Sequence, residues 1–438
     1  MTPQAQFTIV APISAGREAA LRALLASMNT TPGLCDPNNA LLPFAQFPQL
    51  HVARFFVLDD PTLDGSTAYG LPRPELPIYL VLLGDCDGSA DALLQEFAAR
   101  ANNGLRRIFE HCAGFNPQTN LLSWLRANDQ PIAATYVNWV GRTVTQVREE
   151  QALQRALTAQ LARLQGNVLG QRQQAADVQA LHRQLAEYTR NEIADGRLTL
   201  TPPAATPYRW SLRNLVHAIA WPLVAVLAAP LLLIASPWLI YTLRTKEKYD
   251  PELASPPPLA VIQQLQARED HDVTNQFSAV GTVKPGLFRR WAVTILLSGL
   301  NYACRHIYTR GHLTRVQTIH FARWAFLDNK TRLIFASNYD GSLESYMDDF
   351  INKVGWGLNL VFSNGIGYPR TDWLVMNGAR SEQRFKSYLR GHEVPTDVWY
   401  KAYPGMTAVD LARNTRIRDG LERGAMNNAD TIAWLRLL

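Results

Sequence analysis

The N-terminal part of the chain alternates between strand-like and helix-like patterns of apolar residues. A β-rich run at Phe7–Ala11 is followed by apolar residues at helical spacing over 19–28. Two further runs, at Leu50–Asp60 and Ile78–Leu83, combine β-branched and aromatic residues between turn residues, which is typical of strands. The second run leads into Asp-Gly-Ser, whose serine is suited to cap a following helix. With a last strand near Ile132–Val140, the order βαββαβ is that of a ferredoxin-like unit.

The same pattern returns in the C-terminal part of the chain. The string LHVARFFVLDD at Leu50–Asp60 recurs as IHFARWAFLDN at Ile319–Asn329, and each is followed by a run that leads into Asp-Gly-Ser. Three flanking blocks match in the same order: Ala5–Asn29 with Asn275–Asn301, Leu80–Phe97 with Leu333–Phe350, and Ala134–Val147 with Val398–Leu411. Matched blocks in one order predict an internal duplication.

We therefore predict an α+β fold made of two ferredoxin-like halves. A ferredoxin-like sheet carries helices on one face, so its other face needs a partner, and two copies can supply this by packing sheet to sheet as a barrel. In the second half the last strand is expected near Trp373–Met376. The predicted divisions are a first half at 1–142, a helical hairpin at 143–200, an apolar membrane-associated segment at 201–249, a proline-rich linker at 250–274, and a second half with a C-terminal helix at 275–438.

The segment Thr143–Gly196 is rich in glutamine, alanine, leucine and arginine, with apolar residues at helical spacing. The sequence GNVLG at Gly166–Gly170 favours a break, so the segment is predicted to form a helical hairpin. Its expected role is that of a scaffold, or of a contact between copies of the chain in a homo-oligomer. The proline-rich stretch Ser255–Pro258 is expected to act as a stiff linker.

The segment Asn214–Leu243 contains thirty residues without a charged side chain. A transmembrane helix needs about 20 apolar residues. Aromatic residues lie within and beside the segment and basic residues flank both ends, as is typical of a membrane interface. These residues are Trp210, Trp221, Trp238 and Tyr241, with Arg209, Arg213, Arg244, Lys246 and Lys248. A buried core helix is the alternative, but the length of the uncharged run favours a membrane.

A single crossing would place the two halves on opposite sides of the bilayer, where their sheets could not pack together. Two crossings need about 40 residues, which exceeds the uncharged run. Three prolines, Pro222, Pro230 and Pro237, interrupt helical hydrogen bonding within it. A hairpin that enters one leaflet and bends near Ala229 and Pro230 fits best, with both ends at the cytoplasmic face. The expected attachment is monotopic or re-entrant, with membrane lipid as a partner.

Composition agrees with a chain that places apolar surface outside its own core. Apolar residues make up 47% of the 438 residues and charged residues 18%, against about a quarter charged in typical soluble domains. Four cysteines show no CxxC or zinc-site spacing, so no metal–thiolate site is expected. The N-terminal residues lack the basic and apolar regions of a signal peptide, which favours a cytoplasmic chain with reduced cysteines.

A window from Val273 to Leu327 contains seven arginines and lysines and no acidic residue. A positive patch of this kind would attract anionic headgroups, or the carboxylates and phosphates of a ligand. Nucleic acid is the competing partner, but the net charge is only +6 and no nucleic-acid-binding motif accompanies it. Membrane lipid is therefore the expected partner, and nucleic acid is not.

The tandem halves resemble the dimeric α/β-barrel superfamily, which includes dye-decolourising peroxidases and chlorite dismutases. The resemblance is one of topology and covers residues 5–150 and 275–420. The string His320-Phe321-Ala322-Arg323 is similar to a His-Ile-Arg string of the peroxidases, with one residue more. The two Asp-Gly-Ser strings share only Asp-Gly with the peroxidases' Gly-x-x-Asp-Gly motif. The resemblance implies haem as a cofactor, with His320 as the ligand of its metal.

The resemblance also implies roles for four other residues. Arg323 or Arg370 would aid peroxide cleavage or hold a haem propionate, and Asp328 or Asp340 would move protons. Strand alternation places His320 and Arg323 on opposite faces, so a bulge or the pairing of the two halves would be needed for them to meet at one ligand. The loop NGIGYPRTDW, which contains Arg370, is expected to contact a ligand because it combines charge with aromatic residues.

Two functions remain open from the sequence. The first is a membrane-attached, haem-dependent, peroxidase-like oxidoreductase acting on an apolar small molecule that partitions from the bilayer. The second is a non-catalytic, membrane-associated protein that binds lipid or organises a complex. In the second case the repeated histidines and arginines only anchor their strands through hydrogen bonds and ion pairs.

Overall fold

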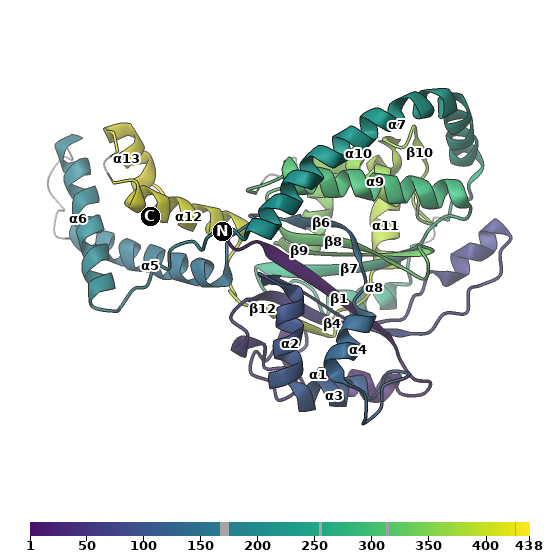
Figure 1. Ribbon diagram of the computed structural model, residues 1–438, viewed down its shortest axis with the longest axis horizontal. Helices are drawn as coiled ribbons and strands as arrows, with labels where there is room; N and C mark the ends of the chain where they lie inside the picture. Colours follow the sequence, from purple (N-terminus) through teal and green to yellow (C-terminus); the bar gives the residue numbers. More distant parts are fainter. Residues whose placement is uncertain (167–174, 254–255, 312, 314, 425) are drawn as a thin grey trace.

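The computed structural model describes residues 1–166, 175–253, 256–311, 313, 315–424 and 426–438. Two four-stranded antiparallel sheets lie face to face in the middle of the molecule, and helices cover the outer face of each (Figure 1). A group of helices projects from one end, and a long curved helix lies over one side (Figure 1). The predicted α+β class is confirmed.

The first sheet has the strand order β1-β5-β4-β12. Its strands are β1 (Gln4–Pro12), β4 (Leu50–Leu58), β5 (Tyr79–Asp87) and β12 (Val398–Lys401), and its outer face is covered by α1 (Glu18–Ala26), α2 (Ala90–Arg100), α3 (Asn102–Phe109) and α4 (Leu121–Asn128). Phe7, Phe55 and Leu82 of this face belong to one buried cluster with Leu25 and Phe97 of the helices. The alternating strand patterns in the sequence supply this core.

The second sheet has the strand order β6-β8-β9-β7. Its strands are β6 (Ile132–Val137), β7 (Thr274–Thr282), β8 (Ile319–Leu327) and β9 (Arg332–Asp340), and its helices are α9 (Leu287–His306), α10 (Leu343–Phe362) and α11 (Glu382–His392). Each sheet takes one strand from the other part of the chain, because β12 pairs with β4 and β6 pairs with β8. The two parts of the sequence are therefore joined by exchanged strands.

The predicted barrel is wrong. Between the sheets lies an apolar layer that includes Phe56, Leu83 and Ile334. In the described part of the chain the ladder pairings end at β1 and β12 in one sheet and at β6 and β7 in the other. Only isolated bridges, such as Ile9 with Asp129 and Ala279 with Glu393, link the facing edges. The sheets form an open sandwich because the edge strands do not continue each other's hydrogen bonds.

The last strand of the second half was expected near Trp373–Met376, and this is also wrong. Residues 373–375 of that segment form a turn between the two-residue strands β10 (Thr371–Asp372) and β11 (Met376–Asn377). Trp373 and Leu374 have φ angles of 56° and 61°, in the left-handed region that a strand does not use. The remaining short elements are β2 (Asn29–Thr31), β3 (Leu34–Cys35), α8 (Leu259–Gln266) and the 3-10 helices Phe44–Gln46, Leu63–Tyr69 and Gly378–Arg380.

The helices at the projecting end come from two distant segments. They are α5 (Val144–Gly166), α6 (Ala175–Ala194), α12 (Ala408–Glu422) and α13 (Asn428–Leu435). Leu153, Leu185, Ile417 and Trp434 share one buried cluster, so the inserted helices and the C-terminal helices form a single unit. The predicted break at Gly166–Gly170 falls largely on residues outside the described part.

Two buried carboxyl groups, those of Glu269 and Glu393, lie beside the edge of β7 and share the guanidinium group of Arg390. Arg390 Nη1 lies 2.5 Å from Glu269 Oε1 and 3.2 Å from Glu393 Oε2. Burial, together with the charge of Glu269, raises the pKa of Glu393 well above its usual range. A carboxyl group with a raised folded-state pKa keeps its proton when the unfolded chain has lost it, so stability falls as pH rises above the unfolded pKa.

We expect Glu393→Gln to remove this fall. In the wild type each pH unit over which Glu393 alone keeps its proton lowers the free energy of unfolding by about 1.4 kcal/mol. Urea denaturation between acid and neutral pH would measure the slope for both proteins. The matched control is Glu382→Gln, an exposed carboxylate at the start of α11, the helix that Glu393 follows. Equal slopes for wild type and Glu393→Gln would contradict the prediction.

Candidate functional site

His320 and Asp340 are neighbours in the structure. His320 lies at a bulge of β8, between the paired residues Ile319 and Phe321. Its Nε2 is 2.6 Å from Asp340 Oδ1, and Asp340 Oδ2 accepts a 2.7 Å hydrogen bond from the backbone N–H of Ala408 at the start of α12. The aspartate of Asp-Gly-Ser thus connects the histidine of β8 to the N-terminus of a helix.

The first sheet repeats this arrangement. His51 lies at the equivalent bulge of β4, and its Nε2 is 2.9 Å from Asp87 Oδ1. Asp87 Oδ2 accepts a 2.9 Å hydrogen bond from the backbone N–H of Val144, where α5 begins. A carboxylate at a helix N-terminus is favoured by the helix dipole. The repeated histidine and aspartate therefore stabilise the junction between each sheet and a helix.

The other predicted residues lie elsewhere. Arg323 points between the sheets, where it donates to the carbonyl of Phe7 and pairs with Asp85. Asp328 accepts a 2.8 Å hydrogen bond from the hydroxyl of Tyr79 and pairs with Arg332. Arg370 is at the surface. Of the five predicted residues only His320 and Asp340 lie together, and the bulge at His320 does not bring it together with Arg323.

The surroundings of His320 do not fit a haem. The side chain is 2% exposed, and the cavity beside it, which His51 and Tyr403 also line, has a volume of only about 20 Å³. A space of this size holds about one water molecule. Its Nε2 faces Asp340 rather than an open position. Among the described residues, no group of three or more histidine, cysteine, aspartate or glutamate side chains is placed to hold a metal ion.

The most exposed apolar element is α7 (Tyr208–Tyr249), a helix of 42 residues. Its most apolar stretch has a mean hydropathy of 2.4 and none of it is buried, and it is the one helix in the described chain that is long and apolar enough to cross a membrane. The helix continues through three prolines and curves along its length (Figure 1). A proline removes one backbone hydrogen bond and bends a helix. The predicted reversal near Ala229 and Pro230 is wrong, because α7 bends there without turning back.

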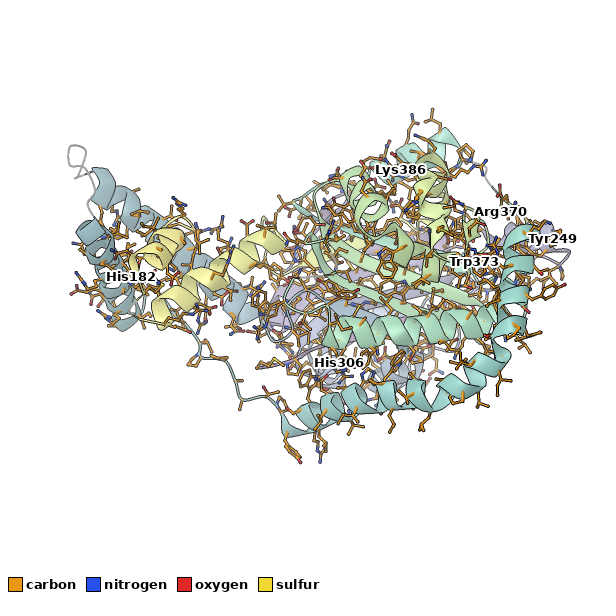
Figure 2. The ribbon with its side chains drawn as sticks, turned by 90° about the horizontal axis from the view of Figure 1, so that it is seen from above. His182, Tyr249, His306, Arg370, Trp373 and Lys386 are labelled. Carbon is orange, nitrogen blue, oxygen red and sulfur yellow. The ribbon has the colours of Figure 1, made fainter. Side chains whose placement is uncertain are left out.

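Both ends of α7 are fixed to the same side of the body. Near its N-terminus, His217 Nδ1 is 2.8 Å from His306 Nε2, and the indole of Trp221 donates to Ser298 of α9. Near its C-terminus, the buried carboxylate of Glu247 accepts hydrogen bonds from the backbone N–H groups of Trp373 and Leu374. Seen from above, α7 runs alongside α9 (Figure 2).

The middle of α7 projects into the surroundings. Leu227, Leu231 and Ile234 are 68%, 71% and 78% exposed. Two neighbouring elements add exposed apolar residues: Leu287, Trp291 and Ile295 on α9, and Trp373, Val375 and Met376 at the β10–β11 turn. We call these three elements together the apolar face. An exposed apolar patch of this extent marks an interaction surface.

The positive window from Val273 to Leu327 does not form one surface patch. Arg289 and Lys284 are buried and pair with Asp250, directly after α7, at 2.7 and 3.3 Å. Burial, with the nearby charge of Arg289, lowers the pKa of Lys284 to about 8. Arg323 is also buried. Much of the positive charge in this window therefore holds the chain together instead of attracting a partner.

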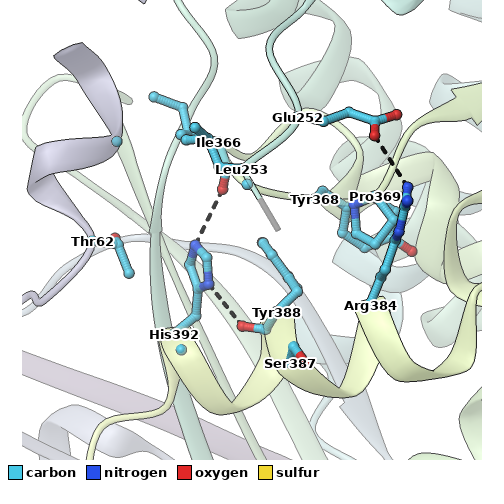
Figure 3. Close-up of a pocket in the computed structure, with 13 residues that line it drawn as sticks. Thr62, Glu252, Leu253, Ile366, Tyr368, Pro369, Arg384, Ser387, Tyr388 and His392 are labelled. Atoms are coloured by element: carbon cyan, nitrogen blue, oxygen red, sulfur yellow. Dashed lines mark hydrogen bonds and ion pairs between the residues drawn. The ribbon is translucent and has the colours of Figure 1, made fainter. Parts of the chain in front are cut away.

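A cavity of about 540 Å³ opens where α7 ends (Figure 3). Its walls come from the 3-10 helix Leu63–Tyr69, the residues after α7, the loop 366–369 and α11. The loop predicted to contact a ligand thus lines the cavity. Glu252 lies at one side, with Arg370 Nε at 3.2 Å and Arg384 Nη1 at 3.1 Å.

His392 lies on the inner wall of this cavity. Its Nδ1 is 2.8 Å from the carbonyl oxygen of Tyr388, and its Nε2 is 3.2 Å from that of Ile366 (Figure 3). Burial lowers the pKa of His392, which favours the neutral ring. A neutral ring has one N–H and carbonyl oxygens only accept, so His392 donates to one of the two carbonyls and shapes the wall of the cavity. Arg370 lies in a loop whose charge and aromatic residues mark it in the sequence, whereas Arg384 and His392 carry no local motif and were not predicted.

Comparison with known proteins gives no match: no family model matches the chain, and neither the curated proteins nor the solved structures include a similar one. The resemblance to the dimeric α/β-barrel superfamily therefore stays a prediction. The apolar face and the cavity beside it are the features of the structure that bear on function.

Proposed function

We propose that the protein is a monotopic membrane protein that attaches to the cytoplasmic face of a bilayer through the apolar face and binds an apolar or lipid molecule there. One observation carries the proposal: α7 is apolar and exposed in its middle, while both of its ends are held on one side of the same body. The peroxidase-like alternative is less well supported, since the surroundings of His320 do not fit a haem.

The geometry favours insertion parallel to the membrane over a crossing. A helix of 42 residues rises about 1.5 Å per residue, so a crossing helix would carry its two ends to opposite sides of a hydrocarbon layer about 30 Å thick. The contacts of both ends with α9 and the β10–β11 turn support an arrangement without such a crossing. Insertion of an exposed apolar side into one leaflet needs no such separation.

Charge at the ends of α7 agrees with the same orientation. Arg209 and Arg213 precede the uncharged run, and Lys246 and Lys248 follow it. Basic residues next to a membrane segment prefer the cytoplasmic side and interact with anionic headgroups. Basic side chains at both ends therefore support one surface of contact, with the two sheets on the cytoplasmic side.

Cysteine labelling of α7 tests this topology. With single cysteines at Arg209 and Lys246, we expect a membrane-impermeant maleimide to label both positions from the same side of sealed vesicles. A cysteine at Leu231, which is 71% exposed in the protein, should be protected because the bilayer covers it. The four native cysteines, of which Cys86, Cys112 and Cys304 are buried, need replacement or a matched background measurement. Labelling of Arg209 and Lys246 from opposite sides would overturn the proposal.

We also propose that the two sheets descend from duplication of a ferredoxin-like unit. Three correspondences support this. The pairing of β1 with β5 and of β7 with β9 has the same length and direction, and both histidines lie at bulges of the equivalent strand. Arg54 of β4 and Arg323 of β8 each cross to the opposite sheet. The four matched sequence blocks agree with these correspondences.

A further inference from the structure

We propose that the cavity at the end of α7 binds a single-chain amphiphile with an anionic headgroup, taken from the membrane. The headgroup would be a carboxylate, as in a free fatty acid, or a phosphate, as in a lysophospholipid. The inference rests on the proposed attachment, because the membrane is the source of the ligand.

The size and lining of the cavity suit one apolar chain. Small-molecule sites typically have volumes of about 300–1,000 Å³, and this cavity measures about 540 Å³. Leu253, Ile366, Tyr368 and Pro369 supply apolar surface along its walls. Burying a chain against such surface gains about 0.8 kcal/mol per CH₂ group. The walls therefore favour an alkyl chain over a polar metabolite.

The charges at the cavity favour an anion. Arg370 and Arg384 share one carboxylate, that of Glu252, so the three side chains carry one net positive charge. The side chains of the two arginines are 47% and 57% exposed, and ion pairs in such positions contribute only about 0–1 kcal/mol. An incoming carboxylate or phosphate can therefore displace Glu252 from Arg384 and accept two parallel hydrogen bonds from its guanidinium group.

The position of the cavity supplies a route from the bilayer. Glu252 and Leu253 lie within four residues of the end of α7, and Arg370 precedes the β10–β11 turn. Figure 2 shows Tyr249, Arg370 and Trp373 at the same end of the molecule, where α7 ends. Arg244 stacks over Trp373, with its guanidinium carbon 4.8 Å from the ring centroid, and so joins α7 to that turn. The apolar face and the charged part of the cavity are thus adjacent, as an amphiphile requires.

Gly391 offers a way to fill the cavity without disturbing the fold. It lines the cavity from within α11, and a Cβ atom there would meet no other atom within 4 Å. Leucine is also a better helix former than glycine. Gly391→Leu therefore occupies cavity space and leaves the apolar face unchanged. The matched control is Gly357→Leu in α10, where a Cβ also meets nothing within 4 Å.

Displacement of a fluorescent fatty acid from the full chain in non-ionic detergent measures binding. We expect saturable binding that unlabelled oleate or lysophosphatidate displaces, with monoolein at least about tenfold weaker because it lacks the charge that Arg384 recognises. Oleate and lysophosphatidate, compared directly, identify the headgroup. Gly391→Leu and Arg384→Gln should each weaken binding about tenfold or more. Gly357→Leu and Arg126→Gln, an exposed arginine paired with Asp91, should bind as the wild type does.

The same variants distinguish binding in the cavity from nonspecific uptake of the fatty acid by α7, since Gly391→Leu leaves α7 unchanged. Binding unchanged in Gly391→Leu, or monoolein equal to oleate, would overturn the inference. Flotation of the same proteins with vesicles reports on attachment alone: we expect Gly391→Leu to float as the wild type does. If the wild type floats with vesicles but binds no amphiphile, the cavity inference is contradicted and the proposed attachment is not.

Discussion

Replacing Arg323 with methionine should lower the free energy of unfolding by about 3–5 kcal/mol, because it leaves a buried carboxylate without its cation. Arg323 is 1% exposed and pairs with Asp85, whose side chain has no exposed surface. The guanidinium also donates to the carbonyl of Phe7 at 2.7 Å. Methionine fills a volume similar to that of arginine, so the substitution leaves little cavity. The loss in the free energy of unfolding therefore arises mainly from the uncompensated charge of Asp85. Urea denaturation in non-ionic detergent gives the value.

Arg54 is the matched control within the same molecule. It crosses between the sheets in the opposite direction, and its partners are neutral: the carbonyls of Phe277 and Ser337 and the side chains of Ser278 and Asn338. Burial, and then the charge of Arg323, lowers the pKa of Arg54 to about 9. Arg54→Met leaves no unpaired charge and relieves repulsion between the two arginines, so we expect a loss of only about 1–3 kcal/mol.

A further variant separates charge from packing. Adding Asp85→Asn to Arg323→Met should recover much of the stability, since it removes the unpaired carboxylate. If Arg54→Met and Arg323→Met cost the same, and Asp85→Asn does not restore Arg323→Met, the asymmetry between the two arginines has no electrostatic basis.

The sequence predicted the features that depend on local pattern. Strands β1, β4, β5 and β8 lie where alternation and turn residues placed them. The long uncharged run became α7, because its length and composition are visible in one continuous segment. The interpretation of the repeated histidine and arginine as anchors also agrees with the structure: His51 and His320 bind aspartates, and the arginines cross between sheets.

Features that depend on contacts between distant segments were not predictable in this way. The exchange of β6 and β12 between sheets is set by pairing over more than 180 residues, and β12 has only four residues. The turn at Trp373 looked like a strand because its aromatic and β-branched residues have β propensity, but Glu247 holds it against α7. The cavity combines four segments, of which only the loop with Arg370 carried a signal.

The curvature of α7 shows why composition alone gave the wrong shape for this segment. Three prolines in thirty uncharged residues suggested a reversal, yet a helix tolerates isolated prolines by bending. Here the ends are fixed by tertiary contacts, with Asn214 and His217 bound by α9 and Glu247 by the β10–β11 turn. These contacts lie outside the segment. They decide where the two ends of α7 lie and that the apolar side faces away from the body.

Replacing three exposed residues of α7 with glutamine, Leu227→Gln, Leu231→Gln and Ile234→Gln together, should abolish membrane attachment. Each of these side chains is more than two-thirds exposed. Burying one leucine or isoleucine contributes about 1.5–3 kcal/mol, so the triple variant loses about 5 kcal/mol or more, equivalent to at least roughly a thousandfold in the partition coefficient. Glutamine is a good helix former, and the residues make little contact with the body, so the fold should remain.

Flotation with vesicles of neutral and of anionic lipid measures this effect. The matched control replaces Leu34, Ile193 and Val409 with glutamine; these are also exposed apolar residues but lie on β3, α6 and α12, and their loss should leave flotation unchanged. Anionic lipid should strengthen binding of the wild type, because the basic residues that flank the uncharged run of α7 add about 1 kcal/mol each near such a surface. If the α7 variant floats as well as the wild type, attachment through this helix is excluded. If both triple variants lose flotation equally, attachment depends on general surface hydrophobicity and the apolar face has no special role.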